Sequence, residues 1–292
     1  MSSEPTSAGR GAEVANPAVP AKKASVDLLP RILSALVLVP VALGLTWWGL
    51  MPFAGLVLAV ALVMTWEWSR VVRGTGIDVV CVIQGITAAL AAGLGATGYS
   101  AMGVVAVLVG AIIVIPLRLG QGARLSALGI FYAALPVVAL LWLREDETYG
   151  FLAVLYLFVV VWTTDIAAFA AGRTIGGPKL WPRVSPNKTW AGLIGGVGTA
   201  ALAGALFGLA IDAPPLRLGL LALGLGLVAQ AGDLAESSLK RSFGVKDSSG
   251  LIPGHGGFMD RMDSIVTVSV AAALLGLLIN MRVPAKALLF GA

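Results

Sequence analysis

Charged side chains are scarce in this sequence of 292 residues. Asp, Glu, Lys and Arg together make up 12% of it, against 58% hydrophobic residues, whereas a soluble domain carries about 25% charged residues. So little polar material cannot cover a surface that faces water, and the mean hydropathy of +0.92 agrees with this. The composition therefore predicts a protein embedded in a membrane.

Cysteine and histidine are almost missing as well. Cys81 is the one cysteine and His255 the one histidine, so an internal disulfide is impossible and a zinc site built from these residue types is excluded. A metal ion here would need oxygen ligands, as Mg²⁺ does. The net charge of +5 could indicate a nucleic-acid partner, but the basic residues lie in short segments between apolar runs. We therefore expect no nucleic acid.

Common catalytic signatures are missing too. The sequence contains neither a GxxxxGK[ST] phosphate loop nor a GxSxG nucleophile elbow. The glycine-rich run 192–198 lies in an apolar segment, where close packing between helices is the usual role of glycine. Nothing in the sequence indicates nucleophilic catalysis by a side chain.

Long apolar runs fill most of the chain after an N-terminal segment rich in Ala, Ser, Pro and Gly. Residues 1–28 are predicted to be a disordered cytoplasmic tail, and 29–292 a single polytopic membrane domain that carries the catalysis. Because a transmembrane helix needs about 20 apolar residues, we expect an all-α protein with about nine spans and a polar cavity on its cytoplasmic side. The predicted spans are 31–49, 51–67, 77–97, 100–117, 126–143, 148–171, 190–211, 216–233 and 264–282.

The least certain boundary separates the first two spans, because 32–66 is one continuous apolar stretch. It is too long for one crossing at 1.5 Å per residue, and Trp48-Gly49 and Pro52 supply the break. With the N-terminus inside, most Lys and Arg residues fall on the cytoplasmic side, as the positive-inside rule requires. The opposite side holds Arg144, Arg217, Arg282 and Lys286. We expect a multi-pass protein of the inner (plasma) membrane, with its N-terminus and active site facing the cytoplasm.

Two polar segments, 162–190 and 230–264, interrupt the apolar sequence and are the predicted catalytic segments. Asp165 falls within the sixth apolar run, where an ionised Asp costs about 2.5–3.5 kcal/mol at the bilayer centre. It is interpreted as a carboxylate that lines a wet cavity. A polar contact between helices, or a position near the interface, is the alternative.

Two carboxylate pairs lie in the second segment, each with its members three residues apart. Asp233 and Glu236 lie at the end of the eighth span, and Asp260 and Asp263 lie at the start of the ninth. Residues at i and i+3 share a helix face, and like charges there repel each other unless a cation intervenes. Both pairs therefore favour a divalent cation, although Asp260 and Asp263 also suit a helix N-terminus.

Basic and glycine residues near these pairs suit polyphosphate. Lys and Arg bind phosphate oxygens, and the turn at Gly256-Gly257 could offer backbone N–H groups to an anion at a helix start. Arg70, Arg73, Arg118 and Arg124 are attributed to membrane topology and to lipid headgroups.

The stretch from Ser237 to Asp263 resembles the signature of the phosphatidate cytidylyltransferases, or CDP-diacylglycerol synthases. It reads SSLKR, then four residues, then KDSSGLIPGHGGFMDRMD. Asp165-Ile166-Ala167-Ala168-Phe169 and Ser185-Pro186-Asn187-Lys188-Thr189 resemble other motifs of the same family. The resemblance spans residues 30–285.

The resemblance implies that CTP or dCTP reacts with phosphatidate to give CDP-diacylglycerol and pyrophosphate. It also implies Mg²⁺, a second cation such as K⁺, contact with membrane lipid, and a homodimer. Asp233 and Asp260 become the leading metal ligands, supported by Asp263 and Asp165, and the catalytic set is Asp260, Asp233, Asp263, Lys240 and Arg241. The substrate-binding candidates are Lys188, Ser185, Asn187, Lys179, Lys246, His255, Gly256 and Gly257.

Other functions remain open at this point. A cytidylyltransferase or CTP-dependent kinase that acts on another lipid phosphate or on a polyprenol would use similar groups. A transporter would also carry carboxylates within its membrane spans. A structural scaffold would leave the two carboxylate pairs unexplained.

Overall fold

The computed structural model describes residues 28–117, 121–252 and 256–291. The predicted tail, apart from residue 28, and the substrate-binding candidate His255 lie outside the described residues. Ten helices and two short strands are present in the described part of the chain. The helices are α1 (Leu28–Trp48), α2 (Leu50–Arg73), α3 (Val79–Ala96), α4 (Ser100–Leu117), α5 (Gln121–Arg144), α6 (Gly150–Thr174), α7 (Trp190–Ala210), α8 (Pro215–Ser242), α9 (Met259–Ile279) and α10 (Pro284–Phe290).

The predicted multi-pass membrane fold is confirmed. Among the described residues, eight helices, α2 to α9, are long and apolar enough to cross a membrane, and Leu33–Trp48 forms a shorter apolar helix. The break between the first two spans falls at Gly49, whose φ of 143° few other residues adopt. The nine predicted spans therefore correspond to α1 to α9.

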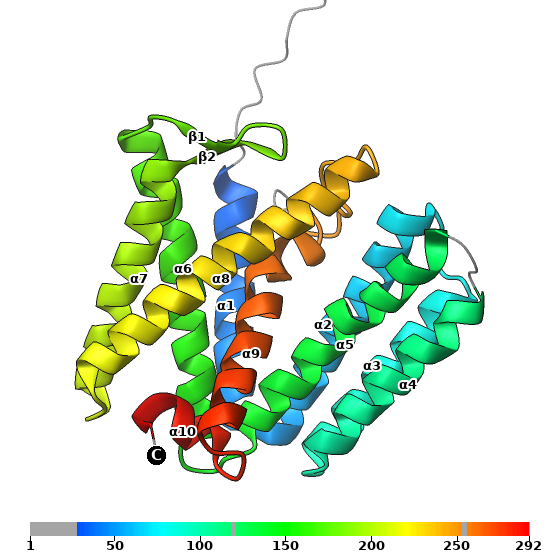
Figure 1. The fold of residues 1–292 in the computed structure, drawn as a ribbon, viewed down its shortest axis with the longest axis horizontal. Coiled ribbons are helices and arrows are strands. Elements are labelled where there is room, and N and C mark those ends of the chain that lie inside the picture. Colours follow the sequence, from blue (N-terminus) through cyan, green and yellow to red (C-terminus); the bar gives the residue numbers. More distant parts are fainter. Residues whose placement is uncertain (1–27, 118–120, 253–255, 292) are drawn as a thin grey trace, which may run out of the picture.

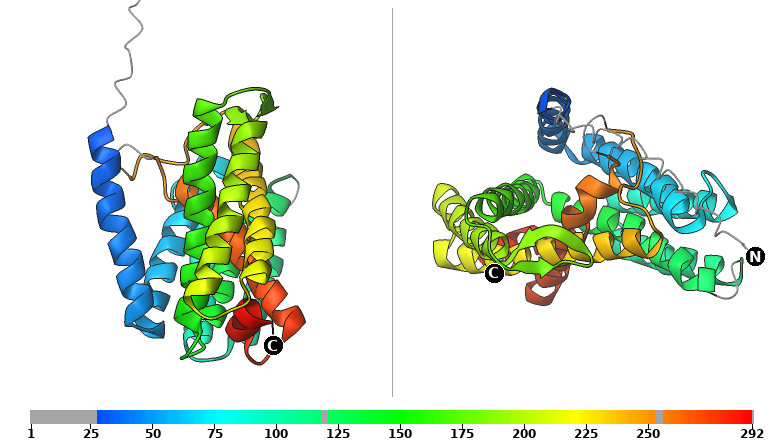
Figure 2. Two further views of the ribbon diagram at one scale, coloured as in Figure 1. Left: turned by 90° about the vertical axis from the view of Figure 1, so that its left-hand side faces the viewer. Right: turned by 90° about the horizontal axis from the view of Figure 1, so that it is seen from above.

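The helices run up and down, so that their connections gather at two ends (Figure 1). The segments 174–190, 242–252 and 256–259 lie at the same end as the C-terminus of α2. In the bundle, α6, α7 and α8 pack together and α3, α4 and α5 pack together, while α9 contacts both α8 and α5. Helix α1 contacts α2 and α6 and stands at the side of the bundle (Figure 2).

Close packing of α6 on α7 explains the glycine-rich run. A Cβ atom on Gly192 would lie 2.8 Å from the Ala168 carbonyl oxygen, and one on Gly196 would lie 2.7 Å from that of Thr164. Neither position has room for a side chain. The interpretation of these two glycines as packing residues is thus confirmed.

A two-stranded hairpin lies between α6 and α7, where the sequence predicted no strand. Strand β1 (Lys179–Trp181) pairs antiparallel with β2 (Ser185–Thr189). Prolines at 178, 182 and 186 argue against a strand in the sequence. They are tolerated because this sheet has two strands only, so each strand is an edge. The hairpin leads directly into α7, since Thr189 caps that helix by accepting a hydrogen bond from the Gly192 N–H at 3.0 Å.

The helices next to the polar segments extend further than the predicted spans. Helix α8 continues from 233 to Ser242, and α9 begins at Met259 rather than at 264. Hydropathy marks the apolar window, but most residues of 233–242, namely Leu234, Ala235, Glu236, Leu239, Lys240 and Arg241, are good helix formers. In consequence Asp233, Glu236 and Lys240 share one face of α8.

Candidate active site

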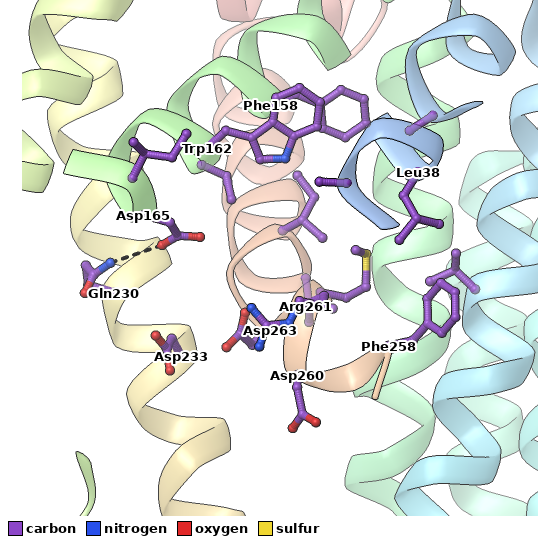
Figure 3. Close-up of a pocket in the computed structure, with 18 of the residues that line it drawn as sticks. Leu38, Phe158, Trp162, Asp165, Gln230, Asp233, Phe258, Asp260, Arg261 and Asp263 are labelled. Atoms are coloured by element: carbon purple, nitrogen blue, oxygen red, sulfur yellow. Dashed lines mark hydrogen bonds between the residues drawn. The ribbon is translucent and has the colours of Figure 1, made fainter. Parts of the chain in front are cut away.

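A cavity of about 1090 Å³ lies between α1, α2, α5, α6, α8, α9 and the hairpin. One part of its wall is polar, with charged groups from both predicted catalytic segments; six of them are Asp165, Arg173, Lys179, Lys188, Asp233 and Asp263. The rest is apolar and includes Leu38, Phe53, Leu56, Met64, Phe158 and Trp162. Figure 3 shows aromatic side chains of α6 above the acidic group of α6, α8 and α9. The cavity can therefore hold an anionic group and a hydrocarbon chain side by side.

Lys188 connects three elements at the polar end of the cavity. Its Nζ lies 2.6 Å from Asp233 Oδ2 and donates to Gln230 Oε1 at 3.2 Å. Gln230 in turn donates from Nε2 to Asp165 Oδ1 at 3.3 Å (Figure 3). A strand residue and two helices are joined in this way, and the Lys188 and Asp233 side chains keep 18% and 28% exposure. Gln230 was not predicted, although an amide one turn before Asp233 in an apolar helix is a usable signal.

Lys240 connects α8 to α9 in a second, more buried set of contacts. Its Nζ lies 2.9 Å from Glu236 Oε1 and also contacts Asp260 Oδ1. Tyr132 of α5 donates its hydroxyl hydrogen to Glu236 Oε2 at 2.8 Å. The Glu236 side chain has 0% exposure and that of Lys240 has 10%. Lys240 does not line the cavity, so its contacts join helices rather than face the polar end.

Asp260 also accepts hydrogen bonds from the loop before α9. The Gly257 N–H donates to its Oδ2 at 2.8 Å, and the Ser248 N–H and hydroxyl donate to the same atom at 3.0 Å. In Figure 3 its carboxylate points away from Asp263. Asp260 lines the cavity, but these contacts engage both of its oxygens. Its role as a metal ligand stays a prediction.

Asp263 carries the third carboxylate of the acidic group. Its Oδ1 accepts from the Ser264 N–H at 2.7 Å, and the charges of Asp233, Asp165 and Glu236 act on it. Carboxylates from α6, α8 and α9 thus face one cavity, as the sequence predicted for Asp165, Asp233 and Asp263. Lys188 lies 2.6 Å from Asp233, and Arg173 and Arg261 line the same cavity, so basic side chains accompany these carboxylates.

Oxygen donors of this kind fit Mg²⁺, which binds through one or two carboxylates and completes its shell with water and substrate phosphate. Among the described residues, no group of three or more Asp, Glu, His or Cys side chains lies close enough together to hold a metal ion. The donor chemistry therefore fits, while the assignment of particular ligands remains a prediction.

The other predicted residues divide into two groups. Lys179 and Asn187 line the cavity beside Lys188. Three others do not line it: Lys246 is exposed, Ser185 is half-buried, and Arg241 donates to the carbonyl oxygens of Val184 and Val245. Arg241 thus ties the hairpin to the end of α8.

Gly256 and Gly257 do not present N–H groups to the cavity. The Gly256 N–H donates to the Ile252 carbonyl oxygen at 3.2 Å, and that of Gly257 donates to Asp260. The expectation of an anion cradle at this turn is therefore not met in this arrangement, because both donors are used within the protein.

Two cavity residues, Arg173 and Arg261, were not assigned a role from the sequence. Both lie in the predicted catalytic segments, Arg173 one turn beyond Phe169 and Arg261 between Asp260 and Asp263. Their position close to the carboxylates in the sequence could have indicated that they belong to the site. They enlarge the set of side chains that can face phosphate.

The fold and cavity together define an integral membrane protein with an acidic and basic site beside an apolar chamber. Residues 29–279 match the sequence model of the cytidylyltransferase family. The chain belongs to that family. A protein of Brucella suis biovar 1 named phosphatidate cytidylyltransferase is 42% identical over 260 residues, which cover 86% of this chain and 93% of that protein. A Bacillus subtilis protein of the same name is 43% identical over 128 residues, 43% of this chain and 48% of its own length.

Proposed function

We propose that this protein transfers a cytidylyl group from CTP to phosphatidate and so forms CDP-diacylglycerol and pyrophosphate. The observation that carries this proposal is a single cavity. Acidic and basic side chains line one part of its wall, and apolar side chains line another. Such a chamber suits a lipid phosphate whose acyl chains stay in an apolar environment. The names of the relatives from Brucella suis and Bacillus subtilis support the same reaction.

In this reaction a phosphate oxygen of phosphatidate attacks the α-phosphorus of CTP. A new P–O bond forms, and the bond between the α-phosphorus and the oxygen bridging to the β-phosphate breaks, so that pyrophosphate leaves with the bonding electrons. The nucleophile is already anionic and needs no strong base. Catalysis therefore rests on positioning and on neutralising charge.

The acidic group is the proposed Mg²⁺ site, with one or two of Asp233, Asp263 and Asp165 as ligands and Asp260 as a further candidate. When bound, Mg²⁺ supplies the positive charge that offsets the developing charge of the transferring group. A second cation such as K⁺ is part of the proposal. Lys188, Lys179, Arg173 and Arg261 would keep two anionic substrates from repelling each other.

Lys188 has a particular place in this scheme because it is paired with Asp233 at 2.6 Å. A metal ion or a phosphate group could replace one partner of this partly exposed pair. We infer that Lys188 then turns to substrate phosphate while Asp233 turns to the cation. Asn187 and Lys179 would complete the nucleotide side of the cavity.

The apolar wall is the proposed site of the acyl chains. Leu38 of α1, Phe53 of α2 and the stacked rings of Phe158 and Trp162 on α6, 5.2 Å apart, form part of it. We further propose that the end holding the hairpin faces the cytoplasm, because Arg70, Arg73, Arg173, Arg183 and Lys246 lie there. Residence in the inner (plasma) membrane, a homodimer and acceptance of dCTP belong to the same proposal.

The experiment is a transfer assay with purified protein, phosphatidate, Mg²⁺ and CTP labelled at the α-phosphate. The expected result is label in lipid, lost in excess EDTA and restored by Mg²⁺. In a parallel assay with CTP labelled at the γ-phosphate, label that enters lipid while the α-label does not would mark a kinase. Flux of substrate across proteoliposomes without nucleotide would mark a transporter, and either result would overturn the proposal.

A further inference from the structure

Glu67 of α2 is fully buried, at 0% exposure, although its residue type is among the costliest to bury. Its carboxylate accepts three hydrogen bonds from a segment more than 180 positions later. The Phe258 N–H donates to Oε1 at 3.0 Å, the Met259 N–H donates to Oε2 at 2.6 Å, and the Ser249 hydroxyl donates to Oε1. The sequence analysis assigned Glu67 no role.

These contacts place Glu67 at the beginning of α9. The helix starts at Met259, and its N-cap residue, Phe258, provides no side-chain cap. The first N–H groups of a helix have no partner within the helix, and a carboxylate is favourable at that end. Glu67 therefore caps α9 from another helix.

The start of α9 carries acidic residues of the site. Asp260 lies in its first turn and Asp263 follows directly after that turn, and the Gly257 N–H that binds Asp260 precedes the two N–H groups that bind Glu67. A Cβ atom on Gly257 would overlap both the Glu67 carboxylate and the Ser248 hydroxyl. The loop, α2 and the start of α9 are therefore packed as one unit around Glu67.

We propose that Glu67 is a positioning residue for nucleotidyl transfer. It does not line the cavity, so its effect reaches the reaction through α9. By holding the first turn of α9 against α2, it fixes Asp260 and Asp263 relative to Asp233 and Lys240 on α8. This inference rests on the proposed function.

The test compares Glu67→Ala and Glu67→Gln with a matched control, Tyr156→Phe. The control also removes a buried hydrogen bond between distant helices, from the Tyr156 hydroxyl to the Leu218 carbonyl oxygen at 2.6 Å, but away from the cavity. We expect kcat of Glu67→Ala to fall by about 10- to 100-fold, the scale of a misplacement of about 1 Å. KM for phosphatidate should stay at the wild-type value, and Glu67→Gln, which keeps one acceptor, should lose less.

A second readout separates positioning from general loss of stability. Hydrogen exchange at residues 257–260 should accelerate in Glu67→Ala and stay at the wild-type rate in Tyr156→Phe. Ser249→Ala should add little to the loss in kcat when it is combined with Glu67→Ala, because both act through one contact.

The outcomes are distinct for the two proposals. A wild-type protein that forms no CDP-diacylglycerol overturns the proposed function. An active wild-type protein overturns the inference alone if Glu67→Ala retains its kcat. The same holds if the exchange rate at 257–260 is unchanged, or if Tyr156→Phe reproduces the loss in kcat.

Discussion

Two sets of polar and charged residues lie near the same end of the bundle, and their contacts differ. In the open set, Lys188, Gln230, Asp233 and Asp165 line the cavity and are joined by single contacts. In the closed set, Lys240, Glu236 and Asp260 are almost fully buried, at 10%, 0% and 5% exposure, and each has several partners. The open set can exchange its partners for ligands, whereas the closed set holds the helices in place.

This difference in contacts indicates different roles for Asp233 and Asp260, which the sequence alone did not distinguish. Asp233 and Asp260 each follow the same i, i+3 spacing to a second carboxylate. Only the structure shows that Asp233 forms a partly exposed pair with Lys188, while Asp260 is bound by Lys240, Ser248 and Gly257. Substitutions in the closed set should therefore reduce stability, whereas substitutions in the open set should reduce turnover.

The largest expected effect is loss of the fold in Lys240→Met. Removal of Lys240 would leave Glu236 and Asp260 buried without their shared cation, which costs about 3–5 kcal/mol for a buried pair. The measurements are yield from the membrane and the midpoint of thermal unfolding in detergent. Lys188→Met is the matched control, because Asp233 keeps 28% exposure and can be solvated without Lys188, so that the loss should lie nearer the roughly 0–1 kcal/mol of a surface pair. Equal destabilisation by both substitutions would remove the distinction between the sets.

The next effect is loss of turnover without loss of the fold in Asp233→Asn. The amide keeps the shape of the side chain but removes the charge proposed to hold Mg²⁺. We expect CDP-diacylglycerol formation to fall on the order of 100-fold or more, the scale of losing one preorganised electrostatic contact. Asp212→Asn removes the same charge at the opposite end of the bundle, where Asp212 is exposed. Normal turnover in Asp233→Asn would exclude it from the site.

A smaller effect is expected at Asp263, which borders both sets. Asp263→Asn removes one of several carboxylates that face the cavity, so the site should still bind Mg²⁺ but more weakly. The Mg²⁺ concentration for half-maximal turnover should rise by about 10-fold or more, the range seen when a metal-site contact is lost. Direct titration of bound Mg²⁺ gives an independent measurement. An unchanged Mg²⁺ requirement by both methods would place Asp263 among the structural carboxylates.

The sequence was sufficient for the architecture because bilayer thickness fixes the length of an apolar helix. It located the break at Gly49 and the face shared by Asp233 and Glu236, since both follow from local geometry. It could not show that Tyr132 pairs with Glu236, or that Glu67 caps α9, because these partners meet only when distant helices pack. The hairpin was missed for a local reason, its three prolines.

The smallest effect in this comparison concerns Thr189, which follows Lys188 and connects the open set to α7. Its hydroxyl accepts from the Gly192 N–H at 3.0 Å and caps that helix. Thr189→Ala should lower stability by about 0.5–2 kcal/mol, the usual cost of losing such a cap, and Thr189→Ser should retain the cap. The thermal midpoints of the two variants measure this difference. Because Lys188 is also held by Asp233 and Gln230, turnover should fall less than in Asp233→Asn. A loss of turnover as large as in Asp233→Asn would mean that the open set depends on the capped helix as strongly as the closed set depends on Lys240.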